Sequence, residues 1–343
     1  MAYTTINKST DYFNTKLYTG NNGTQSITGV GHQPDLIWVK ARNDTANHTL
    51  TDAVRGTNSV LYSNQTQAPD TPTNAITSFD SDGFSVGSNG SFNANSINYA
   101  SWNWKANGQG SSNTDGSINT TYTSVNTTAG FSISQYTGTG SNATVGHGLG
   151  VAPKMIIVKC TSQTDAWGVY HSSVGAGKYL KLNENSAEST ATTVFPTAQT
   201  SSIFYLGDSG LVNGSGRTYI AYCFAEKTGY SKIGSYTGNG NADGPFIYTG
   251  FKPAFVIFKN ASSTSFWQMH DSVRDPFNEV QKRLAPNSSD AEGSGSIPID
   301  FLSNGIKLRT TATTWNESGS NFIYMALAEA PLVGTNNIPA TAR

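Results

Sequence analysis

Two short motifs place an aspartate three residues before an arginine, Asp52-Ala-Val-Arg55 and Asp271-Ser-Val-Arg274. A carboxylate beside a guanidinium could grip a polar ligand, or the two groups could hold a loop by an ion pair. A third place in the chain that matches these two carries His171 and Val174 instead. We favour the ion pair, and we keep the four charged residues as candidate ligand-binding residues.

Tryptophans are the second kind of side chain that could bind a ligand. An exposed indole ring next to polar neighbours suits the stacking of a sugar ring, whose apolar CH face lies on the aromatic face. Trp167 and Trp267 match each other just before the His/Asp positions, and Trp315 lies in a polar stretch. These three are candidate ligand-binding residues, although packing in a core is the interpretation that we favour.

The remaining chemistry is sparse. The five histidines form no HExxH pattern, and neither a Gly-x-Ser-x-Gly elbow nor a phosphate-binding Walker loop occurs. Acidic residues are few and form no recurring pair of the kind that a glycosidase needs. Cys160 and Cys223 could form a disulfide, but two free core thiols are the favoured state. We therefore expect no catalytic residues, no metal site and no cofactor, and the sequence does not indicate an enzyme.

These residues are positioned by a threefold internal repeat. Each repeat begins with Tyr-Thr-Gly, at Tyr18, Tyr136 and Tyr236, and a proline follows at Pro34, Pro153 and Pro253. After each proline comes a short apolar run that ends in lysine: Leu36-Ile-Trp-Val-Lys40, Met155-Ile-Ile-Val-Lys159 and Phe255-Val-Ile-Phe-Lys259. Each repeat ends in an aromatic-rich run: Tyr99-Ala-Ser-Trp-Asn-Trp-Lys-Ala106, Tyr219-Ile-Ala-Tyr-Cys-Phe-Ala-Glu226 and Phe322-Ile-Tyr-Met-Ala-Leu-Ala-Glu329.

The repeat predicts an all-β fold. The five-residue apolar runs are too short for helices and fit central strands that are buried on both faces. Asp82-Gly83, Ser209-Gly210 and Asn304-Gly305 are matching turn pairs between apolar flanks, and Asp82-Gly83 and Asn304-Gly305 predict hairpin turns. A unit of about 90 to 100 residues is long enough to bury a core of its own, so we expect three tandem β-sandwich, jelly-roll-like domains in series.

The expected organisation follows from the repeat and from a stretch rich in Gly, Ser and Asn that lacks an apolar pattern. In order, it comprises an N-terminal docking segment 1–16, repeat one at 17–106, a linker at 107–128, repeat two at 129–229, repeat three at 230–330 and a C-terminal tail 331–343.

Composition excludes some classes of protein. The net charge is −1, only 13% of the 343 residues are charged, and no basic run is present, which argues against nucleic-acid binding. No stretch of 18 apolar residues predicts a membrane helix, and the polar start of the chain does not resemble a signal peptide. The polar composition resembles that of a disordered chain, but 11% aromatic residues in regularly placed apolar runs argue for folded strands.

The repeat resembles one found in virion proteins of marine tailed phages, described as tail-fibre-like or as uncharacterised structural proteins. The segments that carry the resemblance are Ser9–Asn21, Gln33–Lys40, Asp52–Gly56, Tyr99–Ala106, Gly250–Pro253, His270–Arg274 and Ala328–Gly334. Repeat two, which lacks the Asp-x-x-Arg motif, matches less well. The resemblance implies a phage particle and, as for fibres in general, a homotrimer.

From the resemblance we expect a surface-exposed, tail-fibre-like virion structural protein that supports host attachment. Its partners would be other virion proteins, copies of itself and a host surface glycan. A capsid decoration or head-fibre protein is one alternative, and an enzyme that degrades envelope polysaccharide or a glycan-binding module is another.

Overall fold

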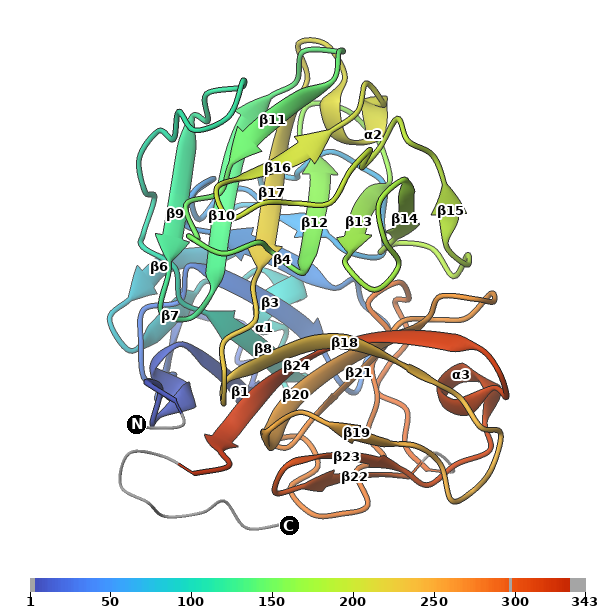
Figure 1. Cartoon of the computed structure of the whole chain (residues 1–343). Helices are drawn as coiled ribbons and strands as arrows, with labels where there is room; N and C mark the ends of the chain where they lie inside the picture. The colour runs from blue at the N-terminus through green and yellow to red at the C-terminus, as the bar shows by residue number, and fades with distance from the viewer. Residues whose placement is uncertain (1–3, 296–297, 334–343) are drawn as a thin grey trace.

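The computed structural model describes residues 4–295 and 298–333 (Figure 1). The fold is all-β, as predicted, and its strands pair antiparallel. None of the helices in these residues is long and apolar enough to span a membrane. The strands divide into three units that follow the repeat.

Unit one begins with the single 3-10 turn η1 (Ser9–Asp11) and contains one short helix, α1 (Gly90–Asn93). Its strands are β1 (Phe13–Thr19), β2 (Gln25–Thr28), β3 (Leu36–Ala41), β4 (Thr49–Asp52), β5 (Leu61–Tyr62), β6 (Ile76–Asp80), β7 (Gly83–Val86) and β8 (Asn98–Trp104). A main sheet has the order β1-β8-β3-β4-β5, and a small outer sheet has the order β2-β7-β6.

Unit two repeats this plan with one short helix, α2 (Gly210–Asn213). Its strands are β9 (Tyr122–Asn126), β10 (Phe131–Thr137), β11 (Ala143–Gly146), β12 (Met155–Cys160), β13 (Trp167–His171), β14 (Lys178–Lys181), β15 (Ser189–Thr190), β16 (Ile203–Leu206) and β17 (Thr218–Phe224). The main sheet has the order β15-β14-β13-β12-β17-β10-β9, and the outer sheet is the pair β11-β16.

Unit three contains α3 (Thr313–Asn316). Its strands are β18 (Ser231–Thr237), β19 (Phe246–Tyr248), β20 (Phe251–Asn260), β21 (Gln268–Asp271), β22 (Ile299–Leu302), β23 (Gly305–Leu308) and β24 (Asn321–Pro331). The main sheet has the order β18-β24-β20-β21 and the outer sheet the order β19-β23-β22. In every unit the closing strand therefore lies between the strand that carries the Tyr-Thr-Gly motif (β1, β10 or β18) and the strand of the apolar run.

The apolar runs are buried on both faces because each main sheet separates two cores. Along β3, Leu36 and Trp38 face a central core, whereas Ile37 and Val39 face the core between the main and outer sheets of unit one. The alternation along β12 and β20 is the same, with Met155 and Phe255 in the central core. Each unit is thus a two-layer sandwich, and a single central core joins all three.

This shared core differs from the expected series of separate domains. Aromatic rings of different units are in direct contact, since Phe13 lies 5.5 Å from Phe255 and Trp104 lies 6.3 Å from Phe224 between ring centroids. Figure 1 shows the three units gathered about a common centre, with unit two (green to yellow) above unit three (orange to red) and unit one (blue) behind. The inner face of each main sheet is apolar, and three such faces are removed from water by packing against one another.

The segment 107–128, expected to be a linker, is structured. It contains β9, which pairs with β10 as an edge strand of the main sheet of unit two, and its Ile118 is buried. Asp35 in unit one accepts hydrogen bonds from the backbone amides of Ala106 (2.6 Å) and Gly108 (3.0 Å), so the start of the segment is anchored as well. The sequence did not predict this strand because its polar Ser and Thr side chains form no apolar pattern, and an edge strand needs few apolar residues.

The ends of the chain also differ from the expected boundaries. Strand β1 begins at Phe13, inside the predicted docking segment 1–16, and Ile6 is buried in the central core. Of the predicted tail 331–343, residues 334–343 lie outside the described residues.

Both predicted hairpin turns are confirmed. Asp82-Gly83 joins β6 to β7 and Asn304-Gly305 joins β22 to β23. Ser209-Gly210, grouped with them as a turn pair, does not join two strands: Gly210 begins α2, and the Ser209 side chain caps the helix by accepting from the Leu211 amide. Ser209 therefore matches Asn89, which caps α1 in the same way.

Candidate functional site

The seven candidate residues lie in the interior. Trp167, Trp267 and Trp315 are no more than 2% exposed, so the favoured interpretation of core packing is confirmed. Asp52, Asp271 and Arg274 are likewise buried, and only 3% of the Arg55 side chain is exposed. Except for Trp315, these residues mark the three contact regions between neighbouring units, which we call the seams.

Trp167 and Trp267 bind the preceding unit. Trp167 donates from its indole Nε1 to the backbone oxygens of Tyr62 (3.0 Å) and Gln65 (3.1 Å) in unit one. Trp267 donates in the same manner to Lys181 of unit two (3.0 Å). A buried indole N–H needs an acceptor, and here the acceptor comes from the neighbouring unit. These rings therefore join units and have no free face for a sugar.

His48 occupies the position in unit one that matches Trp167 in unit two and Trp267 in unit three. Its Nδ1 accepts from Trp38 Nε1 at 3.0 Å, and its ring stacks on Trp102 with centroids 6.5 Å apart. Burial lowers the pKa of His48 well below its usual value, and a backbone interaction with Ala285 of unit three opposes that shift. The same position thus faces the preceding unit in all three repeats, which closes the units into a ring.

The first Asp-x-x-Arg motif forms the predicted ion pair. Arg55 Nε lies 2.6 Å from Asp52 Oδ2, and the hydroxyl of Tyr222 in unit two donates to the same oxygen at 2.7 Å. Burial alone would lower the pKa of Arg55, but Asp52 and Tyr222 raise it on balance. The motif therefore connects unit one to the closing strand of unit two.

The second motif forms the matching connection from unit three to unit one. Arg274 Nε lies 2.5 Å from Asp271 Oδ2, which also accepts from the indole of Trp102 at 3.1 Å. The Arg274 guanidinium lies 5.4 Å from the Trp102 ring centroid, and it reaches Glu292 at 3.1 Å. Cation–π contact and full hydrogen bonding compensate the burial of these charges.

His171 takes the place of the aspartate at the third seam. Ser173 donates its backbone N–H to Nδ1 at 3.2 Å, so the ring proton lies on Nε2, which contacts the Tyr324 oxygen of unit three at 3.3 Å. Burial lowers the pKa of His171 to about 4, and the imidazole is neutral at pH 7. A neutral donor thus replaces the ion pair in the less well matched repeat.

Three buried lysines were not identified from the sequence as candidate functional residues. Lys40, Lys159 and Lys259 end the apolar runs and are fully buried, and burial lowers the pKa of each to about 8. Lys159 donates to the Thr66 oxygen of unit one (3.1 Å), and Lys259 donates to the Asn185 oxygen of unit two (3.3 Å). Their recurrence at the end of an otherwise apolar strand was the available signal. The geometry makes Lys159 and Lys259 seam residues, whereas Lys40 donates to the oxygens of Ala41 and Asp44 in its own unit.

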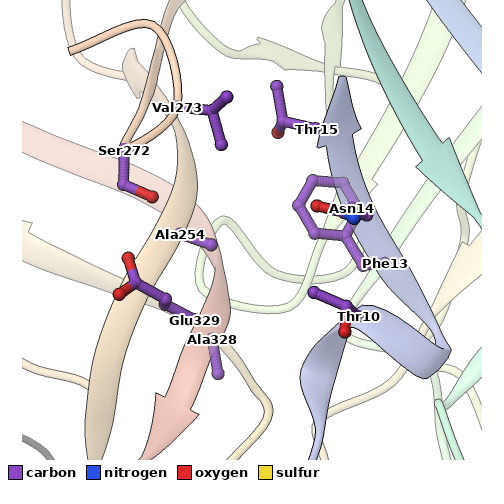
Figure 2. A pocket seen from close by; sticks show the side chains of 9 residues that line it. All are labelled: Thr10, Phe13, Asn14, Thr15, Ala254, Ser272, Val273, Ala328 and Glu329. Atoms are coloured by element: carbon purple, nitrogen blue, oxygen red, sulfur yellow. The ribbon is translucent and has the colours of Figure 1, made fainter. Parts of the chain in front are cut away.

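One hollow lies on the seam between units three and one (Figure 2). Its volume is about 230 Å³, and Phe13, Asn14 and Thr15 of β1 face Ser272 and Val273 across it. Val273 is 39% exposed, and Thr15 Oγ1 has no hydrogen-bond partner among the described residues. The residues that line this hollow therefore carry mostly apolar or hydroxyl side chains.

A larger hollow, which we call the unit-three groove, lies beside α3. Its volume is about 430 Å³, within the usual range of ligand pockets. Its lining includes aromatic, charged and hydrogen-bonding side chains: Phe266, Gln268, Arg283, Asp290, Thr313 and Thr314. Trp315 lines its base, so this is the one of the seven candidates that reaches the groove. Sequence reasoning missed Phe266, whose only signal was an aromatic residue next to the buried Trp267.

The described residues contain no cluster of three or more His, Cys, Asp or Glu side chains that could hold a metal ion. Cys160 and Cys223 are buried and free, in agreement with the favoured prediction. Burial raises the pKa of Cys223 to about 12, so this thiol stays protonated at neutral pH.

Fold and seams together define an all-β protein made of three related units with a common core. Residues 8–331 match a family described as a domain of unknown function, DUF7483, and because the match covers nearly the whole chain, the protein belongs to that family. No curated protein matches the chain.

Proposed function

We propose that the protein is a structural component of a phage virion that is exposed on the particle, is tail-fibre-like and supports attachment to the host. The observation that carries the proposal is the uneven distribution of exposed apolar side chains. Among the described residues, six large apolar side chains are exposed, and five of them lie in unit three: Phe246, Tyr248, Phe266, Val273 and Phe277. A contiguous exposed apolar patch marks an interaction surface, and this excess makes unit three the part of the protein where such a patch is expected.

The seams support the same proposal. Hydrogen bonds to the buried aspartates, indole hydrogen bonds and two lysine contacts connect the units, and a body connected in this way can carry one binding surface in a fixed orientation. The virion context itself rests on the resemblance of the repeat to phage virion proteins. A capsid decoration or head-fibre protein would need the same rigid body and stays an alternative.

Labelling of phage particles tests the proposal. Antibodies against the purified chain, viewed by electron microscopy on the phage that encodes it, are expected to mark the tail. Labels over the whole head, in hundreds of copies, would favour decoration of the capsid, and particles that carry no label would contradict the proposal. Purified protein is expected to form a homotrimer, so light scattering should give about three times the mass of one 36.4 kDa chain.

An enzyme that degrades envelope polysaccharide is the alternative of a different class. The unit-three groove is the best place for such a reaction, but its lining includes a single carboxylate, Asp290, whereas glycosidases commonly use two. Loss of host capsule on incubation with the protein, abolished by Asp290→Asn, would favour this alternative.

A further inference from the structure

Phe266 forms one wall of the unit-three groove and is held in place from both sides. The backbone amide of Ser265 donates to the Asn185 oxygen of unit two at 2.7 Å, and the Trp267 indole donates to Lys181 of the same unit at 3.0 Å. The ring between these anchors is 45% exposed. An aromatic face is thus presented to solvent on a backbone that unit two fixes.

The opposite wall is held by unit one. The segment that carries Asp290 receives a hydrogen bond from the Ala46 amide to the Ser289 oxygen (2.9 Å), and the Glu292 amide donates to the Arg42 oxygen (2.7 Å). Arg42 also forms an ion pair with Glu292 at 2.8 Å. Both walls are therefore preorganised, which lowers the entropic cost of binding a ligand.

The groove contains polar groups whose hydrogen bonds are unfilled. Gln268 is only 5% exposed, and its Oε1 has no partner among the described residues. The Arg283 guanidinium lies 5.6 Å from the Trp315 ring centroid, and within the described part of the chain its side chain forms no ion pair. The Gln268 Oε1 atom is itself buried, so Arg283 is the lining group that can donate to a ligand oxygen.

The lining favours a ligand that carries no charge. Arg283 and Asp290 have opposite charges, so the groove does not present the uniformly positive or negative lining that would favour an anion or a cation. A ligand with many hydroxyl groups can donate to Asp290 and accept from Arg283, because each hydroxyl both donates and accepts. The apolar face of a sugar ring fits the face of Phe266. We propose that the unit-three groove binds a neutral saccharide.

Unit two lacks this site although it has the same fold. Ala166 and Gly168 stand at the positions of Phe266 and Gln268. Leu211 and Val212 of α2 lie 3.3 and 3.2 Å from the point where a side chain at Gly168 would begin, so the equivalent space is filled. These differences in sequence and packing distinguish unit three from unit two at the proposed saccharide site.

The proposal deepens the proposed function, because it names the chemical class that the attachment surface would recognise. An array of neutral and acidic glycans probed with the full-length chain tests it, and the best neutral glycan is then titrated by calorimetry. We expect neutral glycans to bind, and Phe266→Ala to weaken that binding about tenfold through loss of the stacking contact. Arg283→Gln should weaken it as well.

Phe277→Ala is the matched control, since Phe277 is 75% exposed in the same unit but does not line the groove. It should leave the affinity unchanged, and thermal melts should show that both phenylalanine variants remain folded. The proposal is overturned if no neutral glycan binds, if acidic glycans alone bind, or if Phe266→Ala binds as tightly as the natural chain. Particle labelling is independent of this result, so failure of the saccharide site and failure of the virion assignment are distinguishable.

Discussion

Asp52 and Asp271 occupy matching places in their repeats, but their arginine partners differ in a second contact. Arg274 also reaches Glu292, whereas Arg55 has no other carboxylate among the described residues and binds Ser59, Leu50 and Tyr222. Asp52→Asn would leave a buried guanidinium without a counter-charge, which costs about 3–5 kcal/mol of unfolding free energy. Asp271→Asn should cost less, because Glu292 remains beside Arg274.

Urea denaturation of the two variants measures this difference. Asp11→Asn serves as the control, because the Lys8–Asp11 pair is largely exposed and such pairs contribute little. Equal losses for Asp52→Asn and Asp271→Asn would show that Glu292 does not compensate.

Buried histidines should make the protein less stable in mild acid. Burial lowers the pKa of His171 to about 4 and that of His270 to about 3, against about 6.5 in the unfolded chain. The unfolded state then binds more protons below pH 6.5, so the stabilisation is complete above that pH and declines as the pH falls. For His171 the loss between pH 6.5 and 5 is on the order of 2 kcal/mol.

Urea midpoints measured from pH 7.5 to 5 check this expectation. His171→Gln, which keeps a neutral hydrogen-bond donor, should reduce the slope of stability against pH. A slope identical to that of the natural chain would show that His171 is not protonated on unfolding in this range.

Sequence reasoning at the residue scale succeeded where a side chain had one local partner. The Asp52–Arg55 and Asp271–Arg274 pairs lie three residues apart, so a motif could reveal them. It could not show that Tyr222 or Trp102 completes each pair, because these partners are 170 and 169 residues away. The unit-three groove was missed for a similar reason, since its lining comes from segments of unit three that are far apart in the sequence, from Phe266 to Trp315.

The hairpin between β6 and β7 gives a prediction at the scale of the element. A side chain at Gly83 would place its Cβ 1.9 Å from the Ile27 oxygen on the neighbouring strand β2. Gly83→Ala must therefore move β2 and should destabilise the protein by more than about 2 kcal/mol. Gly56→Ala is the control, because Gly56 also has a positive φ (87°) but open space around it. Similar melting temperatures for the two variants would contradict the steric argument.

Strands with an apolar pattern were predictable, whereas elements that depend on neighbours were not. The runs that became β3, β12 and β20 are apolar on both faces, and that pattern alone indicates a buried strand. The polar strand β9 is defined by its pairing with β10, and Ser209-Gly210 resembles a turn pair between apolar flanks although it begins a helix. Both depend on contacts that a short window of sequence does not contain.

At the scale of the whole molecule, the repeat revealed three units but not their arrangement. A unit of this size can bury a core of its own, and each does so between its two sheets. The inner faces of the main sheets lie outside these three cores, because Trp38, Met155 and Phe255 point the other way and are covered by the neighbouring units. Apolar residues on both faces of one strand predict burial on both sides without saying which part of the chain supplies the second layer.

The shared core predicts that the three units unfold together. Separating one unit would expose the inner face of every main sheet and break the buried hydrogen bonds at two seams, so no partly unfolded state should be stable. Differential scanning calorimetry should give one transition whose calorimetric and van't Hoff enthalpies agree. Asp52→Asn, located in unit one, should move that whole transition to lower temperature without splitting it, because the cost is carried by a core that all three units share. Two or more transitions, with only one of them shifted by Asp52→Asn, would instead mean that the units behave as the independent domains that their sequence repeat suggested.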